Sequence, residues 1–254
     1  MIITEPDLLF IPFGAAGFHA RHFALAGFSP DGLALSTPVP HALVSRSLRR
    51  PIRINNGPVQ FILERAREDL SGVDAQFALL RANLVRVCGD WQAPARDFLN
   101  RYFADVEAEI EAARATLEDW ARPFAGLFEP RHWMFSALMP LPRAHIHLPR
   151  RPGGFEVQDD DLVRVDFAFW TGERLVAVVI DTGATLLPRQ RRVRERLEAA
   201  DLDLVTLGKS EIAADGSLLA RLGERFRDFW QDEPLPSGPF KGATRLTTIA
   251  RAGG

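Results

Sequence analysis

Short apolar runs separated by polar turns dominate the second half of the chain. Residues 163–170 and 175–181 are rich in Val, Ile, Phe and Trp, and the four residues between them, Thr-Gly-Glu-Arg, are polar. Two such runs around a short polar loop predict a β-hairpin. A basic segment at 188–200 and a further apolar run at 202–207 follow, so we expect a helix and then another strand.

Helical periodicity governs the middle of the chain and its end. Over residues 94–120, apolar side chains recur at alternating steps of four and three, at Leu99, Phe103, Val106, Ile110, Ala113, Leu117 and Trp120. This spacing predicts an amphipathic helix of about seven turns. Shorter helices are predicted at 59–70 and 74–88, and a last helix at 217–230 with Leu218, Leu222, Phe226 and Phe229 on one face.

Together these elements predict an α/β protein in two parts. Residues 1–130 form a mainly helical N-terminal region, with short strands at its Gly- and Pro-rich start. Residues 131–254 form an α/β part in which the second hairpin strand leads through a helix to another strand. That strand must lie parallel to the one before the helix, because a helical crossover joins parallel neighbours.

Composition narrows the function classes only a little. The 254 residues are 46% hydrophobic and 25% charged with a net charge of −2, so overall charge indicates neither a nucleic acid nor a membrane as partner. Cys88 is the only cysteine, which excludes an internal disulfide. The chain shows no signal-peptide pattern and no run of 18 apolar residues, so we expect a cytoplasmic protein.

Two aspartates in the predicted hairpin are the strongest candidates for chemistry. If Trp170 pairs with Leu175, then Asp181 lies opposite Arg164, and Asp166 points to the same face two residues along. The two carboxylates would be diagonal neighbours, roughly 6–8 Å apart. Carboxylate oxygens at that distance could hold a divalent cation between them.

The order of these motifs resembles the restriction-endonuclease-like (PD-(D/E)xK) superfamily, and within it the very-short-patch-repair endonuclease type. Val165-Asp166-Phe167 is similar to its first acidic strand, residues 178–183 to its second, 189–197 to its polar helix and 200–207 to its closing strand. The resemblance covers about residues 140–230. It implies a restriction-endonuclease-like α/β/α core with a mixed central sheet over residues 131–254.

The activity that the resemblance implies is metal-dependent hydrolysis of phosphodiester bonds in DNA, with RNA as a possible substrate. Asp166 and Asp181 would hold Mg²⁺ or Mn²⁺ against the scissile phosphate. The chain departs from the family at the lysine two residues after the second acid, where it has Gly183. The basic or polar role could move to Gln190 or Arg189 on the following helix, or to Lys209 after the closing strand.

The basic helix is a second candidate site. Five arginines fall within about two turns: Arg189, Arg191, Arg192, Arg194 and Arg196. Guanidinium groups suit bidentate phosphate contacts, which favours nucleic-acid binding. The alternative is a surface helix whose arginines pair locally with Glu195 and Glu198. A further basic cluster lies at Arg46, Arg49, Arg50 and Arg53.

Other residues favour structural roles. His145 and His147 alternate on a predicted strand, but zinc needs more ligands than two, and Cys88 lies in an apolar helical stretch. The rival to the nuclease is a catalytically degenerate module of the same fold that binds nucleic acid or a protein partner without cutting. The N-terminal helical region could supply the partner surface. Some nucleases of this superfamily act in bacterial defence, including alongside prokaryotic Argonaute proteins.

Overall fold

The structure is a computed structural model of the 254-residue chain. It describes residues 9–14, 24–29, 32–36, 42–45, 50–55, 72–124, 127–148, 161–183, 188–214 and 216–233. The helix expected at 59–70, together with Arg46 and Arg49, lies outside the described residues.

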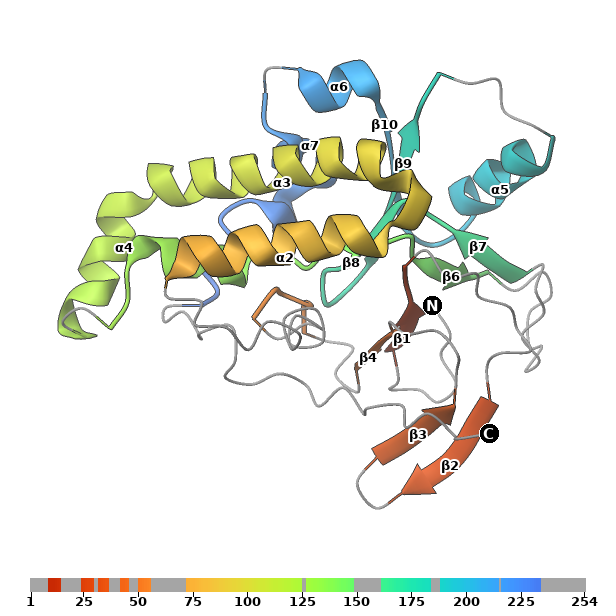
Figure 1. Ribbon diagram of the computed structural model, residues 1–254, viewed down its shortest axis with the longest axis horizontal. Coiled ribbons are helices and arrows are strands. Elements are labelled where there is room, and N and C mark those ends of the chain that lie inside the picture. Colours follow the sequence, from red (N-terminus) through yellow and green to blue (C-terminus); the bar gives the residue numbers. More distant parts are fainter. Residues whose placement is uncertain are drawn as a thin grey trace.

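Among the described residues, a four-stranded mixed sheet in the order β10-β9-β8-β5 forms the centre of the protein (Figure 1). Its strands are β5 (Leu141–Pro142), β8 (Phe167–Trp170), β9 (Leu175–Asp181) and β10 (Asp203–Gly208). The register Trp170↔Leu175 is confirmed, and β10 runs parallel to β9, as the crossover rule predicted. The protein is therefore an α/β protein with a mixed sheet.

In the part of the chain that the structure describes, three two-stranded ladders lie outside this sheet. They pair β1 (Leu9–Pro12) with β4 (Ala42–Ser45), β2 (Ala24–Ser29) with β3 (Gly32–Ser36), and β6 (His145–His147) with β7 (Leu162–Arg164). All three ladders are antiparallel. Short strands at the start of the chain were predicted, and the β1–β4 and β2–β3 ladders confirm them.

Helices α2 (Val73–Val87) and α3 (Gln92–Ala112) form an antiparallel hairpin, and α4 (Arg114–Ala121) follows at an angle (Figure 1). The predicted helix over 94–120 is thus two helices, which part at Ala113. Neither proline nor glycine stands at the break. Short 3₁₀ segments complete this region: η2 (Gly89–Trp91), η3 (Arg122–Phe124) and η4 (Pro130–Ser136).

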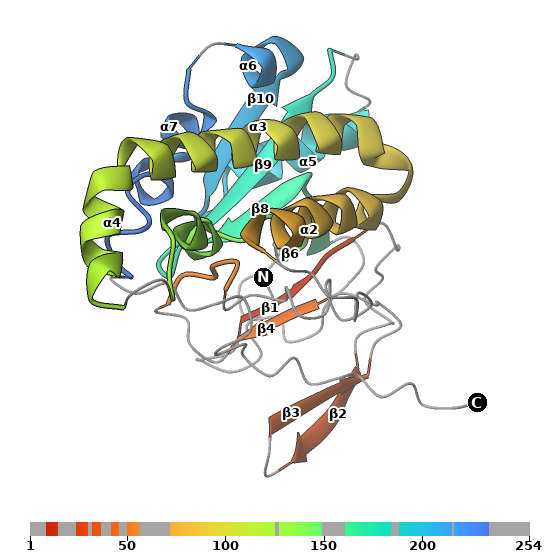
Figure 2. The ribbon, with the colours of Figure 1, turned by 60° about the vertical axis from the view of Figure 1, so that its left-hand side comes forward.

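The helices cover both faces of the sheet. Figure 2 shows α3 crossing in front of the strands and α5 (Pro188–Glu198) behind them. After β10 come α6 (Lys209–Ala213), α7 (Leu218–Leu222) and the 3₁₀ segment η6 (Glu224–Phe226). The prediction of one helix over 217–230 was wrong, because Gly223 has a φ of 125° and ends α7.

One hydrophobic core joins the two halves of the chain. The ring of Phe98 on α3 stacks on Phe167 with centroids 4.3 Å apart, and Tyr102 lies 5.4 Å from Phe169. The Tyr102 hydroxyl donates to the Leu138 carbonyl at 2.6 Å. Residues on both sides of position 130 therefore pack together, and a boundary there does not divide the core that the structure describes.

Arg53 has a structural role rather than the nucleic-acid contact considered for its basic cluster. It is buried, and its guanidinium donates to the carbonyls of Ser136 and Phe229 at 2.6 and 2.8 Å. The same group forms an ion pair with Asp232 at 2.8 Å. This contact holds the segment after η6 against the body of the protein.

Replacing Phe98 tests whether the two halves unfold together. We expect Phe98→Ala to lower the free energy of unfolding by about 3–5 kcal/mol, because it opens a cavity between α3 and the sheet. Far-ultraviolet circular dichroism and tryptophan fluorescence should report one coincident transition in urea. Leu127→Ala, at a position that is 71% exposed, is the control and should change stability by less than about 0.5 kcal/mol. Two separate transitions would contradict a shared core.

Candidate functional site

The strand that carries the first aspartate is divided. The run 163–170 was expected as one strand, but the structure has β7, ending at Arg164, and β8, beginning at Phe167. Arg164 lies opposite His145 in the β6–β7 ladder, so the expected pairing of Asp181 with Arg164 was wrong. The physical reason is that the chain leaves β9 at this point and joins a different partner strand.

Asp166 lies between β7 and β8, where the strand divides, and hydrogen bonds of its backbone and side chain hold it there. Its N–H donates to the Val178 carbonyl at 3.0 Å, although Phe167 is the residue that faces Val178 in the ladder. Its Oδ2 accepts a hydrogen bond from the N–H of Ile180 at 2.7 Å. The carboxylate thus accepts the hydrogen bond that the backbone of a continuing strand would have accepted from β9. It does not simply project from one face of the sheet, as the alternation of side chains along a strand predicted.

The two acids nevertheless come to the same end of β9. Ile180, which donates to Asp166, directly precedes Asp181, the last residue of the strand. Asp181 is exposed, and its Oδ1 accepts from the Gly183 N–H at 2.8 Å. One carboxylate is therefore half-buried beside the strand, and the other is open to solvent at its tip.

Gly183 stands where the resembled family has its lysine. A Cβ there would meet no atom within 4 Å, so space is not the obstacle. The obstacle is the backbone, whose φ of 75° is one that L-residues with side chains rarely adopt. The turn that returns the Gly183 N–H to Asp181 thus disfavours a lysine at this position.

Lys209 lies at the same edge of the sheet. Gly208, the last residue of β10, is the parallel partner of Asp181, and Lys209 follows it as the first residue of α6. Lys209 is exposed. Glu211 accepts from the Gly208 N–H at 2.6 Å and fixes this strand-to-helix turn. Of the residues that could replace the missing lysine, Lys209 is the one whose backbone adjoins Asp181.

Arg143 is a site residue that sequence reasoning missed. Its N–H donates to the Asp166 carbonyl at 2.7 Å, and its Nη1 lies 3.7 Å from the Asp166 carboxylate. The guanidinium lies over the Trp91 ring, 5.3 Å from the centroid. The backbone is strained at φ 53°, and Nε is buried with no hydrogen-bond partner. No sequence signal marks it, because its position depends on β5 lying beside β8.

Burial sets the electrostatics of this cluster. It raises the pKa of Asp166 above its ordinary value of 3.8, while the Ile180 N–H and Arg143 act in the opposite direction. Burial also raises the pKa of Cys88 to about 12. Because the Cys88 thiol donates to the Leu84 carbonyl at 3.3 Å inside the core, its predicted structural role is confirmed.

The arginines of α5 divide into two groups. Arg194 pairs with Glu198 at 2.9 Å, and Arg196 donates to the Leu148 carbonyl, so these two have structural partners. Arg191 and Arg192 are exposed and are available to a ligand. Arg189 and Gln190 belong to the helix, but their side chains lie outside the described residues.

The two histidines lie on β6, beside the division of the strand. His145 is buried and faces Arg164 across the ladder. Burial lowers the pKa of His147. The described part of the chain contains no group of three or more His, Cys, Asp or Glu side chains that could hold a metal ion. A preformed zinc site of that kind is therefore not found there.

Asp166 and Asp181 still fit a different kind of metal site. Mg²⁺ prefers oxygen ligands and is commonly held by one or two carboxylates, with water and substrate phosphate completing its shell. Both groups are hard oxygen donors at one strand end, and each has one oxygen bonded to a backbone N–H. The donor set suits an ion that binds together with substrate rather than one enclosed by protein.

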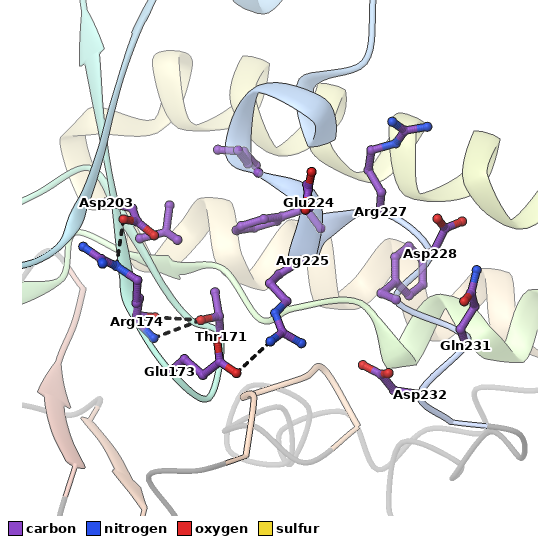
Figure 3. A pocket seen from close by; sticks show the side chains of 15 residues that line it. Thr171, Glu173, Arg174, Asp203, Glu224, Arg225, Arg227, Asp228, Gln231 and Asp232 are labelled. Atoms are coloured by element: carbon purple, nitrogen blue, oxygen red, sulfur yellow. Dashed lines mark hydrogen bonds and ion pairs between the residues drawn. The ribbon is translucent and has the colours of Figure 1, made fainter.

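A pocket of about 550 Å³ lies at the other end of the sheet (Figure 3). It is bordered by the β8–β9 loop and by Asp203, the first residue of β10, so about 20 Å of strand separates it from the acids. Four of its charged groups pair with one another, Arg174 with Asp203 at 2.9 Å and Arg225 with Glu173 at 2.7 Å, and Arg227 and Asp232 pair with residues outside it. We therefore do not assign the chemistry to this pocket.

No family model matches the chain, and no curated protein or solved structure matches it either. Among the residues that the structure describes, no helix is long and apolar enough to cross a bilayer. The function must therefore be argued from the site itself.

The raised pKa of Asp166 predicts a pH-dependent cost in stability. Between the ordinary value of 3.8 and the raised folded pKa, the folded state binds the proton more tightly than the unfolded state, so the free energy of unfolding falls as pH rises. Asp166→Asn removes this cost. In EDTA, the stability of the variant relative to wild type should increase from pH 3.5 to pH 7, as measured by urea titration at several pH values.

Asp201→Asn, which removes a carboxylate that is 99% exposed, is the charge-matched control for this series. A relative stability of Asp166→Asn that decreases with rising pH would contradict the assignment.

Proposed function

We propose that the protein is a metal-dependent nuclease with a restriction-endonuclease-like core that hydrolyses phosphodiester bonds in DNA. The observation that carries the proposal is the hydrogen bond from Ile180 to Asp166, which brings a half-buried carboxylate to the strand end formed by Asp181. The topology supports it, since β9 crosses through α5 to the parallel strand β10. A biological role in bacterial defence would be compatible with this activity.

In this proposal Asp166 and Asp181 hold Mg²⁺ or Mn²⁺, which supplies polarisation of the phosphate and a water of lowered pKa when it is bound. Lys209, exposed beside the partner of Asp181, neutralises charge on the phosphate. Gln190 on α5 is the polar alternative for this role. Arg191 and Arg192 would hold the DNA backbone near the site.

The second candidate is a degenerate module of the same type that binds nucleic acid or a protein without cutting. Two observations favour it. The backbone at Gly183 disfavours the family's lysine, and Arg143 places a cation 3.7 Å from the Asp166 carboxylate, where it would compete with a metal ion. Cleavage and binding measured on the same protein separate the two candidates.

Replacing Asp181 tests the nuclease directly. Wild type should cut labelled DNA with Mg²⁺ or Mn²⁺ and not with EDTA. Asp181→Asn should cut on the order of 10²–10³-fold more slowly, because a metal ligand contributes several kcal/mol of transition-state stabilisation. The exposed Asp201→Asn variant is the control and should cut like wild type. Metal-dependent cutting that survives Asp181→Asn would refute the site. DNA binding without cutting by wild type would favour the degenerate module.

Replacing Lys209 tests its proposed charge-neutralising role. We expect Lys209→Gln to lower kcat on the order of 10²-fold, since one preorganised donor to developing charge has an effect of that size. Lys209→Arg should recover part of the loss, because it keeps the positive charge. The Kd for DNA in EDTA should change little in both variants. Equal activity of Lys209→Gln and wild type would exclude Lys209 and leave Gln190 as the candidate.

A further inference from the structure

A basic groove lies along the helical hairpin, on the side that faces away from the sheet. It has a volume of about 460 Å³ and is lined by Arg81 and Arg86 of α2 and by Arg96 and Asn100 of α3. All four side chains are exposed. Of the residues that line it only Val85 is buried in the core, so the groove is open to solvent rather than filled by packing.

The charge of this groove is not balanced. No acid lines it, and among the described residues neither Arg81 nor Arg96 forms an ion pair. Arg86 donates to the neutral amide of Asn83 at 2.6 Å. Three guanidinium groups therefore face one groove without a carboxylate partner.

Other arginines of the same helical region do have acidic partners. Arg114 pairs with Glu111 at 2.6 Å, Arg122 pairs with Asp119, and Arg131 pairs with Asp74 at 2.7 Å. Repulsion between unpaired cations costs free energy. The ion pairs on the surrounding surface show that these helices can carry acidic partners for their arginines. An anionic ligand would remove that cost at the groove.

The groove also leads toward the acidic end of the sheet. Arg86 lies in the last turn of α2 and Arg96 within two turns of the start of α3, on either side of the connection that contains Trp91. Arg143 lies over the Trp91 ring and is the ion-pair partner of Asp166. A polyanion in the groove would thus enter the molecule next to the element that contacts the candidate site.

We propose that this groove binds the sugar-phosphate backbone of duplex DNA, at a stretch away from the bond that is cut. Arginine forks and an asparagine amide are common donors to phosphate oxygens. Arg81 and Arg86 are separated by about 7.5 Å along α2, which corresponds to about two phosphate-to-phosphate steps of about 3.4 Å along the duplex axis. The choice of DNA rests on the proposed function, while the binding of a polyphosphate backbone rests on the groove alone.

The test is the salt dependence of binding by the full chain in EDTA, where no cutting occurs. The variant carries Arg81→Gln, Arg86→Gln and Arg96→Gln, and a fluorescent DNA duplex is the probe. We expect Kd to increase about tenfold or more near 0.1 M salt, and the slope of log K against log salt to decrease by about 2 to 3. The control carries Arg114→Gln, Arg122→Gln and Arg131→Gln, has the same net charge, and should bind like wild type.

An unchanged Kd and slope in the groove variant would overturn the proposal, and so would an equal loss in the control, because that would reflect net charge alone. Circular dichroism verifies that the groove variant is folded before its DNA binding is measured. Groove-dependent binding by a wild type that cuts nothing with Mg²⁺ or Mn²⁺ would support the groove while refuting the nuclease. Metal-dependent cutting with groove-independent binding would do the reverse.

Discussion

The hydrogen bond from the Ile180 N–H to the Asp166 carboxylate is the contact on which the candidate site depends. Where β8 leaves β9, the N–H of Ile180 would lose its ladder partner, and an unpaired buried donor costs about 1–3 kcal/mol. The aspartate replaces that partner. In doing so it is drawn into a half-buried position that raises its pKa, and it is fixed next to Asp181. The division of the strand and the chemistry of the acid are therefore one feature.

The sequence alone was sufficient to predict elements that are marked by a local or periodic pattern of residues. Two apolar runs around a short polar loop predicted the Trp170–Leu175 register, and a basic helical segment between two strands predicted that β10 lies parallel to β9. The division of the strand at Asp166 could not be predicted, because it depends on β7 pairing with β6 instead of continuing along β9, and no residue pattern marks that change of partner. The end of α7 depended on the positive φ of Gly223 rather than on apolar spacing.

The residues of the candidate site show the same contrast between what local sequence predicts and what depends on tertiary pairing. The acids could be predicted because they flank one hairpin, and Lys209 because a parallel closing strand ends beside Asp181. Arg143 could not, since only the tertiary pairing of β5 with β8 brings it to Asp166. Counting the arginines of α5 also overestimates how many are available to a ligand, because a sequence does not reveal that Arg196 donates to the Leu148 carbonyl.

Unpaired charge is more informative here than net charge. The chain is nearly neutral at −2, and many of its arginines are matched by acids within 4 Å. Among the described arginines that no acid matches are Arg191 and Arg192 on α5 and the three arginines of the α2–α3 groove, which belong to helices on opposite faces of the sheet (Figure 2). The two acids lie at the sheet end between these layers. A ligand that engages all three must be long, anionic and regular along its length, and these are the properties of a nucleic-acid backbone.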